Sequence, residues 1–194
     1  MATILDQLAD HARERVAADQ ERVPLDALKR LIADGAVPAR EPFAFETALK
    51  KPGLSFICEI KKASPSKGII SEAFPYLEIA REYERAGADA ISCLTEPKWF
   101  LGSDKIFRDV RETVSVPMIR KDFTVDAYQI YQAKAMGADA MLLICAILSE
   151  DEIRRSLALC DELGLSALVE AHDAAELQMA VRAGARIIGV NNRN

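Results

Sequence analysis

The chain has 194 residues, of which half are hydrophobic and 28% charged, and its 25 Lys and Arg against 30 Asp and Glu give a net charge of −5. This composition supplies enough apolar side chains for one sizeable core and excludes an intrinsically disordered chain. The mild acidity argues against charge-driven binding to nucleic acid. No run reaches the ~18 apolar residues of a membrane span, and no signal-peptide pattern opens the chain, so we expect a cytoplasmic protein without a membrane partner.

The first fifty residues carry helical patterns and no strand pattern. Residues 2–20 form a charged amphipathic pattern, and residues 24–33 form a second, which begins at Pro24 and ends near Gly35. Residues 43–50 predict one or two further helical turns. We therefore interpret residues 1–50 as a helical N-terminal extension, and residues 51–194 as the main unit of the fold.

From residue 54 the pattern changes to short apolar runs that alternate with amphipathic helical windows. Six runs have the length of a strand: residues 55–61, 90–95, 117–121, 140–145, 167–171 and 187–191. Three of the joints between helix and strand share a glycine suited to a helix end, namely Gly87, Gly137 and Gly184. This βαβα alternation predicts an α/β fold with a parallel sheet and helices outside it.

Two architectures fit this alternation, an open doubly wound sheet and a (β/α)8 TIM barrel. A doubly wound nucleotide binder usually carries a Gly-rich turn after its first strand, whereas here the sequence KKASPSKG follows at residues 61–68. The barrel is therefore favoured. It needs eight strands in about 250 residues, and the sequence supplies about six βα units, so we expect a partial barrel.

Polar residues cluster where the predicted strands end. Since residues i and i+2 of a strand share a face, four strands each present a pair there: Glu59 and Lys61, Lys121 and Phe123, Glu170 and His172, Asn191 and Arg193. A single charged residue at a strand end is usually a solvated terminus. Four strands with the same parity favour an acid–base site at the barrel mouth, where the loops after the strands build active sites.

Other reactive side chains are interpreted as structural. His172 is expected to support the fold or the site, and Trp99 to anchor a loop. Cys58, Cys93, Cys145 and Cys160 form no CxxC pair, and three of them lie in apolar runs. We expect reduced thiols rather than disulfides or a metal site.

Five segments together resemble one family, the indole-3-glycerol-phosphate synthases. They are CEIKKASPSKG at residues 58–68, LTEPKWFLGS at 94–103, IRKDF at 119–123, LVEAH at 168–172 and VNNRN at 190–194. Their order and spacing are those of the family, and the helical leader is similar to the family's N-terminal extension, which packs over the barrel mouth. The resemblance covers essentially the whole chain.

The resemblance implies a carbon–carbon lyase of tryptophan biosynthesis. Its substrate is a phosphorylated anthranilate–ribulose adduct, 1-(2-carboxyphenylamino)-1-deoxyribulose 5-phosphate, which closes to indole-3-glycerol phosphate with loss of CO2 and water. No metal or organic cofactor is implied. We expect a monomer or weak homo-oligomer.

The family's site residues carry over onto matching positions of this sequence. Lys121 matches the general acid of ring closure, Lys61 a lysine that contacts substrate and acts in dehydration, and Glu59 and Glu170 a pair of carboxylates. Of these two, one is a base and the other organises the lysines, and both assignments stay open. The substrate-binding positions are Asn191 and Arg193 at the anthranilate end, Ser64 on the phosphate side, and Phe100 and Phe123, which sandwich the aromatic ring.

The sequence also departs from the family, since no segment matches its seventh and eighth βα units, which carry the phosphate grip. Two alternatives therefore stay open beside the synthase. One is another phosphate-binding barrel, such as an isomerase of histidine or tryptophan synthesis. The other is a catalytically silent partial barrel that associates through its open edge.

Overall fold

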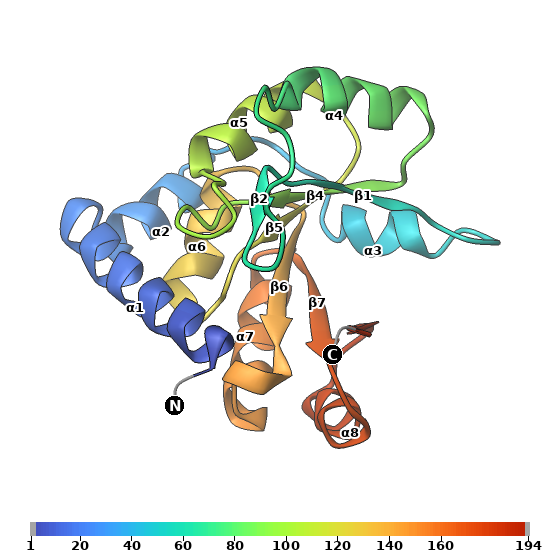
Figure 1. Ribbon diagram of the computed structural model, residues 1–194. Coiled ribbons are helices and arrows are strands. Elements are labelled where there is room, and N and C mark those ends of the chain that lie inside the picture. The colour runs from blue at the N-terminus through green and yellow to red at the C-terminus, as the bar shows by residue number, and fades with distance from the viewer. Residues whose placement is uncertain (1–2, 193–194) are drawn as a thin grey trace.

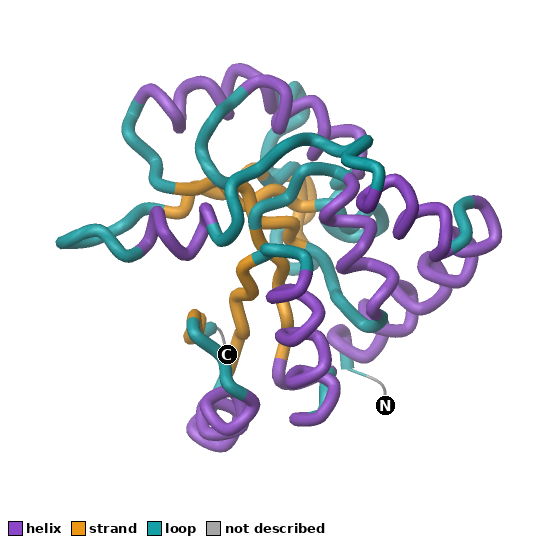
Figure 2. The backbone as a smooth tube through the Cα atoms, turned by 180° about the vertical axis from the view of Figure 1, so that it is seen from behind, coloured by secondary structure: helices purple, strands orange, loops and turns teal. Residues whose placement is uncertain are grey.

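The computed structural model describes residues 3–192, and within them a six-stranded parallel sheet runs through the molecule. Its strands are β1 (Ile57–Ile60), β4 (Ala90–Leu94), β5 (Met118–Lys121), β6 (Ala140–Ile144), β7 (Ser166–Ala171) and β8 (Ile187–Val190). They are hydrogen-bonded in the order β1-β4-β5-β6-β7-β8, so every strand lies beside its neighbour in the chain. All six predicted strands are confirmed. The sheet curls into half a barrel, which confirms the predicted fold class (Figures 1 and 2).

A helix connects each strand of this sheet to the next. These are α4 (Tyr76–Arg85), α5 (Asp104–Thr113), α6 (Ala127–Ala135), α7 (Glu150–Glu162), which follows the short 3₁₀ turn η1 (Cys145–Ile147), and α8 (Ala174–Ala183). They lie outside the curled sheet (Figure 1). Gly87, Gly137 and Gly184 have φ of +87°, +79° and +93° at the ends of α4, α6 and α8, as the repeated helix-end motif predicts.

One hairpin escapes the sequence pattern. Strands β2 (Ala63–Ser64) and β3 (Gly68–Ile69) pair antiparallel in the loop after β1. Because two-residue strands are too short to show a period of two, the sequence pattern does not distinguish them from a loop.

Three helices precede the sheet: α1 (Ile4–Arg22), α2 (Leu25–Ala33) and α3 (Ala44–Leu49). A capping box between Thr3 and Asp6 begins α1. Val16 and Leu28 pack against Tyr128 of α6, so α1 and α2 lie beside α6 (Figure 1). The Tyr128 hydroxyl also donates a hydrogen bond of 2.9 Å to the carbonyl of Val23, the residue that ends α1.

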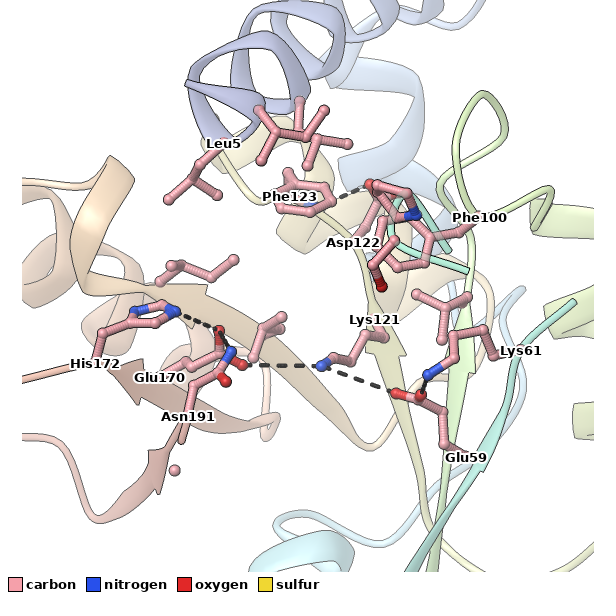
Figure 3. Close-up of a pocket in the computed structure, with 18 of the residues that line it drawn as sticks. Leu5, Glu59, Lys61, Phe100, Lys121, Asp122, Phe123, Glu170, His172 and Asn191 are labelled. Atoms are coloured by element: carbon pink, nitrogen blue, oxygen red, sulfur yellow. Dashed lines mark hydrogen bonds and ion pairs between the residues drawn. The ribbon is translucent and has the colours of Figure 1, made fainter. Parts of the chain in front are cut away.

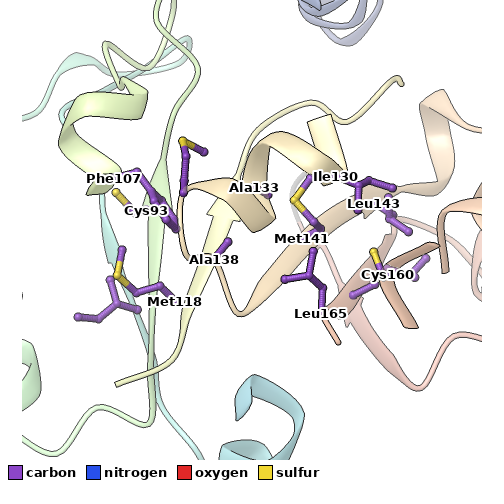
Figure 4. Packing of buried hydrophobic residues seen from close by; sticks show 14 of the residues in the cluster. Cys93, Phe107, Met118, Ile130, Ala133, Ala138, Met141, Leu143, Cys160 and Leu165 are labelled. Carbon is purple, nitrogen blue, oxygen red and sulfur yellow. The ribbon is translucent and has the colours of Figure 1, made fainter. Parts of the chain in front are cut away.

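The apolar core has two layers, because successive side chains of each strand face opposite sides of the sheet. The outer layer lies between the sheet and helices α4 to α8, and Figure 4 shows Phe107, Met118, Met141 and Cys160 packed in it. The inner layer includes Ile119, Leu142 and Ile144, which Phe45 of α3 joins. Leu142 and Ile144 reach the cavity described below, so the inner layer is also the floor of the site.

Two further structural findings concern the cysteines and the helices. The four cysteines are free thiols, and three of them are buried, with Cys58 half-buried. No helix in residues 3–192 is long and apolar enough to cross a membrane.

Candidate active site

A cavity of about 580 Å³ opens at the C-terminal ends of the strands. The polar residues at these strand ends line it: Glu59 of β1 and Lys61 just after it, Lys121 of β5, Glu170 of β7 and Asn191 after β8. The structure therefore brings together five residues from four segments of the sequence, up to 132 positions apart in the numbering (59 to 191). Figure 3 shows them facing one another across the mouth.

Lys121 occupies the middle of this charged group. Its Nζ atom lies 3.9 Å from an oxygen of Glu59 and 3.8 Å from an oxygen of Glu170. These separations are within ion-pair range but longer than a hydrogen bond, so the ammonium N–H groups are not committed to either carboxylate. An ammonium group held by charge alone between two carboxylates keeps its protons available for a third acceptor in the cavity.

Each carboxylate has a second partner on its far side. Lys61 Nζ contacts the other oxygen of Glu59, and Asn191 Nδ2 donates to the other oxygen of Glu170 at 3.0 Å. His172 also lines the cavity, and its Nε2 lies 3.7 Å from Glu170. The carboxylates are thus fixed in place, and the pair of acids alternates with the pair of lysines across the mouth.

Apolar side chains form the other walls of the cavity. Phe100 and Phe123 both line it, and their ring centroids are 6.1 Å apart at an interplanar angle of 41°. Stacking a substrate ring between them requires roughly 7 Å, which is twice the optimal contact distance of carbon atoms. The two rings contact each other and form one continuous wall, so a sandwich requires a side-chain rotation.

A buried carboxylate sets the loop that carries Phe100. The Glu96 side chain is inaccessible to solvent and accepts hydrogen bonds from the backbone N–H groups of Lys98, Trp99 and Phe100. The Nδ1 atom of His11 in α1 lies 3.3 Å from an oxygen of the same carboxylate. The His11 and Trp99 rings pack edge to face, with their centroids 5.3 Å apart. Trp99 therefore stands at the contact between this loop and α1, which agrees with its predicted role as an anchor.

Helix α1 supplies a wall that sequence reasoning does not assign. Ile4, Leu5 and Leu8 line the cavity, and Figure 3 shows Leu5 above the charged group. Their spacing along the chain places them on one helical face, which is the signal that could have identified them. Sequence reasoning also passes over Asp122, a buried aspartate between Lys121 and Phe123.

Two predicted substrate-binding residues, Ser64 and Arg193, are not among the residues that line the cavity in the described part of the chain. Ser64 is buried in the β2–β3 hairpin, while its neighbours Pro65 and Ser66 line the cavity. Arg193 lies outside the described residues. The roles of all nine predicted site residues stay predictions. Within residues 3–192 no three His, Cys, Asp or Glu side chains are grouped so as to hold a metal ion.

A parallel half-barrel with alternating lysines and carboxylates at its mouth defines an acid–base enzyme of the (β/α)8 class. The family model described as indole-3-glycerol phosphate synthase matches residues 5–194. The chain belongs to this family.

Curated relatives agree with that assignment. An indole-3-glycerol phosphate synthase of Ruminiclostridium cellulolyticum is 54% identical over 98% of this chain and 73% of its own length. Synthases of Lacticaseibacillus paracasei and Lachnoclostridium phytofermentans are 50% and 47% identical over 98% of this chain, and 73% and 74% of their own lengths.

Proposed function

We propose that this chain carries the catalytic residues of the indole-3-glycerol phosphate synthase reaction of tryptophan biosynthesis. The substrate is 1-(2-carboxyphenylamino)-1-deoxyribulose 5-phosphate, and the products are indole-3-glycerol phosphate, CO2 and water. The observation that carries the proposal is the Lys121 ammonium group, which lies 3.9 Å and 3.8 Å from two carboxylates inside a cavity with an aromatic wall. Family membership supports this reaction over that of another phosphate-binding barrel.

Lys121 is the proposed acid of ring closure. As the carboxyl-bearing ring carbon attacks the ketone carbon, the carbonyl π electrons move to oxygen, which takes a proton from the ammonium group. The electrons of the bond to the departing CO2 then return to the ring. Positioned proton transfer of this kind typically accelerates a reaction by about 10²–10⁴-fold.

Dehydration then removes the new hydroxyl group and a proton from the adjacent carbon. Lys61 is the proposed acid for the departing hydroxyl, and either Glu59 or Glu170 is the base for the proton. Glu59 contacts Lys61 directly and Glu170 is held by Asn191, so each carboxylate has a fixed partner during the step. Comparing Glu59→Gln with Glu170→Gln assigns the base, because the base variant accumulates the hydroxylated intermediate.

The remaining predicted site residues bind the substrate in this proposal. Phe100 and Phe123 contact the anthranilate ring, and Asn191 and Arg193 orient its carboxylate until CO2 leaves. Ser64 belongs to the hairpin on the phosphate side. Residues 1–50 act as an extension whose first helix covers the mouth. We further propose that the protein is cytoplasmic, is a monomer or weak homo-oligomer, and binds neither nucleic acid nor a membrane.

The test uses the chain in two forms, the 194-residue polypeptide and the same polypeptide extended by the last two βα units of the Ruminiclostridium cellulolyticum relative. We call the second form the extended protein. Each is incubated with the substrate, and formation of the indole product is followed by its fluorescence. We expect the extended protein to form product and its Lys121→Ala variant to lose most of this activity. Product formation that does not depend on Lys121 contradicts the proposal, as does a folded extended protein that forms no product.

A further inference from the structure

Asp122 is a buried carboxylate at the end of β5, directly between Lys121 and Phe123. Arg15 of α1 donates two hydrogen bonds to it, at 2.6 and 3.1 Å, one to each oxygen. The Thr95 hydroxyl donates a third at 2.6 Å, and the backbone N–H of Phe123 a fourth at 2.8 Å. The carboxylate therefore ties together helix α1, the end of β4 and the end of β5.

The electrostatics of this group keep Asp122 charged. Burial opposes the charge, but the nearby guanidinium groups of Arg120 and Arg15 and the hydroxyl of Thr95 outweigh it and hold the pKa of Asp122 below its usual value. Arg120 itself lies 3.6 Å away. A buried charge is costly when it loses its partner, so the pair with Arg15 fixes where α1 lies on the strand ends.

The position of Asp122 decides the direction of its two neighbours. Since side chains alternate along an extended segment, a residue held toward α1 sends the residues on either side of it into the cavity. Lys121 and Phe123 both line that cavity (Figure 3). The backbone is also held by the neighbouring strand, because Thr95 N–H donates to the Lys121 carbonyl at 3.0 Å.

We propose that Asp122 is a positioning residue, which, held by Arg15, aims Lys121 and Phe123 at the substrate. Because α1 also places Leu5 and Leu8 in the cavity wall, the Arg15–Asp122 pair holds in place both this wall and the side chain of Lys121, the proposed acid. The inference rests on the proposed function for its kinetic consequence. Its structural consequence, the placement of the Phe123 ring, is independent of any reaction.

The chain offers a matched control at the other end of the same strand. Asp139 is also buried, and it accepts hydrogen bonds from Arg40 at 2.8 and 3.1 Å, from Arg111 at 3.0 Å and from the backbone N–H of Met118, the first residue of β5, at 2.8 Å. Asp139 thus has the same burial and the same kinds of partner, but it lies at the end of the sheet away from the cavity.

The experiment compares Asp122→Asn, Arg15→Lys and Asp139→Asn. In the extended protein, we expect Asp122→Asn to lower kcat by about 10- to 100-fold, the scale of a misplacement near 1 Å. Asp139→Asn is expected to lower the melting temperature by a comparable amount while kcat stays within about threefold at temperatures where both variants are folded. Arg15→Lys keeps the charge but loses the two-pronged contact, so its kcat is expected to lie between these two values.

A second readout separates this inference from the proposed function. In the extended protein without substrate, the contact between the Phe100 and Phe123 rings is expected to give a nuclear Overhauser effect, which should weaken in Asp122→Asn and persist in Asp139→Asn. Equal effects of the two aspartate variants on kcat and on this ring contact overturn the positioning role. An unsubstituted extended protein without turnover overturns the proposed function, while the ring contact still decides the role of Asp122.

Discussion

Replacing Lys121 by alanine removes a proton donor and a positive charge at once, whereas replacing it by arginine removes only the donor. An arginine side chain stays protonated near neutral pH, so it restores the charge between Glu59 and Glu170 without supplying a proton. The two variants therefore separate the two contributions of one side chain.

The structure sets the size of each contribution. At separations of 3.8 and 3.9 Å, each ion pair is worth roughly 4 kcal/mol at an effective dielectric constant near 20, and partial exposure of all three side chains lowers this further. Loss of positioned acid catalysis costs about 10²–10⁴ in rate, or roughly 2.7–5.5 kcal/mol. Because the ammonium N–H groups are not hydrogen-bonded to the carboxylates, we expect donation to dominate, so that Lys121→Arg stays within about tenfold of Lys121→Ala.

The assay measures kcat and KM for both variants in the extended protein by the fluorescence of the indole product. Lys62→Ala is the matched control, since Lys62 is the next lysine along from Lys61 but does not line the cavity. We expect its kcat to be near that of the unsubstituted protein. Near-normal turnover of Lys121→Arg refutes the proton-donor role and leaves charge alone as the function of Lys121.

Three further predictions concern stability and accessibility. A polypeptide of residues 1–194 alone is expected to form little product and to associate, because six strands leave the β8 edge unpaired and Val190 exposed. Size-exclusion chromatography measures the association and the fluorescence assay measures product formation. A monomer with robust turnover contradicts this prediction. The lowered pKa of Asp122 means that its charge stabilises the fold above about pH 4 and that this stabilisation is lost as the pH falls further. In urea unfolding between about pH 5 and 3, the free energy of unfolding of Asp122→Asn should therefore fall less steeply with pH than that of the unsubstituted protein. Equal pH dependence of the two proteins speaks against the prediction. Iodoacetamide at about pH 8 should modify half-buried Cys58 before Cys93 and Cys160, because burial raises the pKa of the Cys93 and Cys160 thiols to about 12. Peptide mass spectrometry measures the labelling of each cysteine, and equal labelling argues against the burial of Cys93 and Cys160.

The alternation of apolar and polar residues along the sequence determines much of this fold. A run such as residues 140–145 is apolar throughout, because a strand that is buried on both faces needs no polar side chains on either of them. The parity rule likewise groups Glu59, Lys121 and Glu170 from the sequence alone, since a strand has only two faces. The five family-like motifs add the reaction itself.

Other features of the site depend on contacts that no local pattern records. The sequence marks Asp122 only as an aspartate beside a lysine, and its pairing with Arg15 across 107 positions exists because α1 returns over the strand ends. The short β2–β3 hairpin, which buries Ser64 away from the cavity, is likewise below the length at which periodicity becomes visible.

Local periodicity and short connections are thus enough to predict the sheet, its strand order and the residue types at the mouth. The distances of Lys121 from its two carboxylates, the tilt between Phe100 and Phe123, and the wall that Leu5 provides follow from the folded arrangement instead. Hydrophobic patterning fixes which face of an element is buried, whereas long-range ion pairs and close packing fix where that element lies against the others.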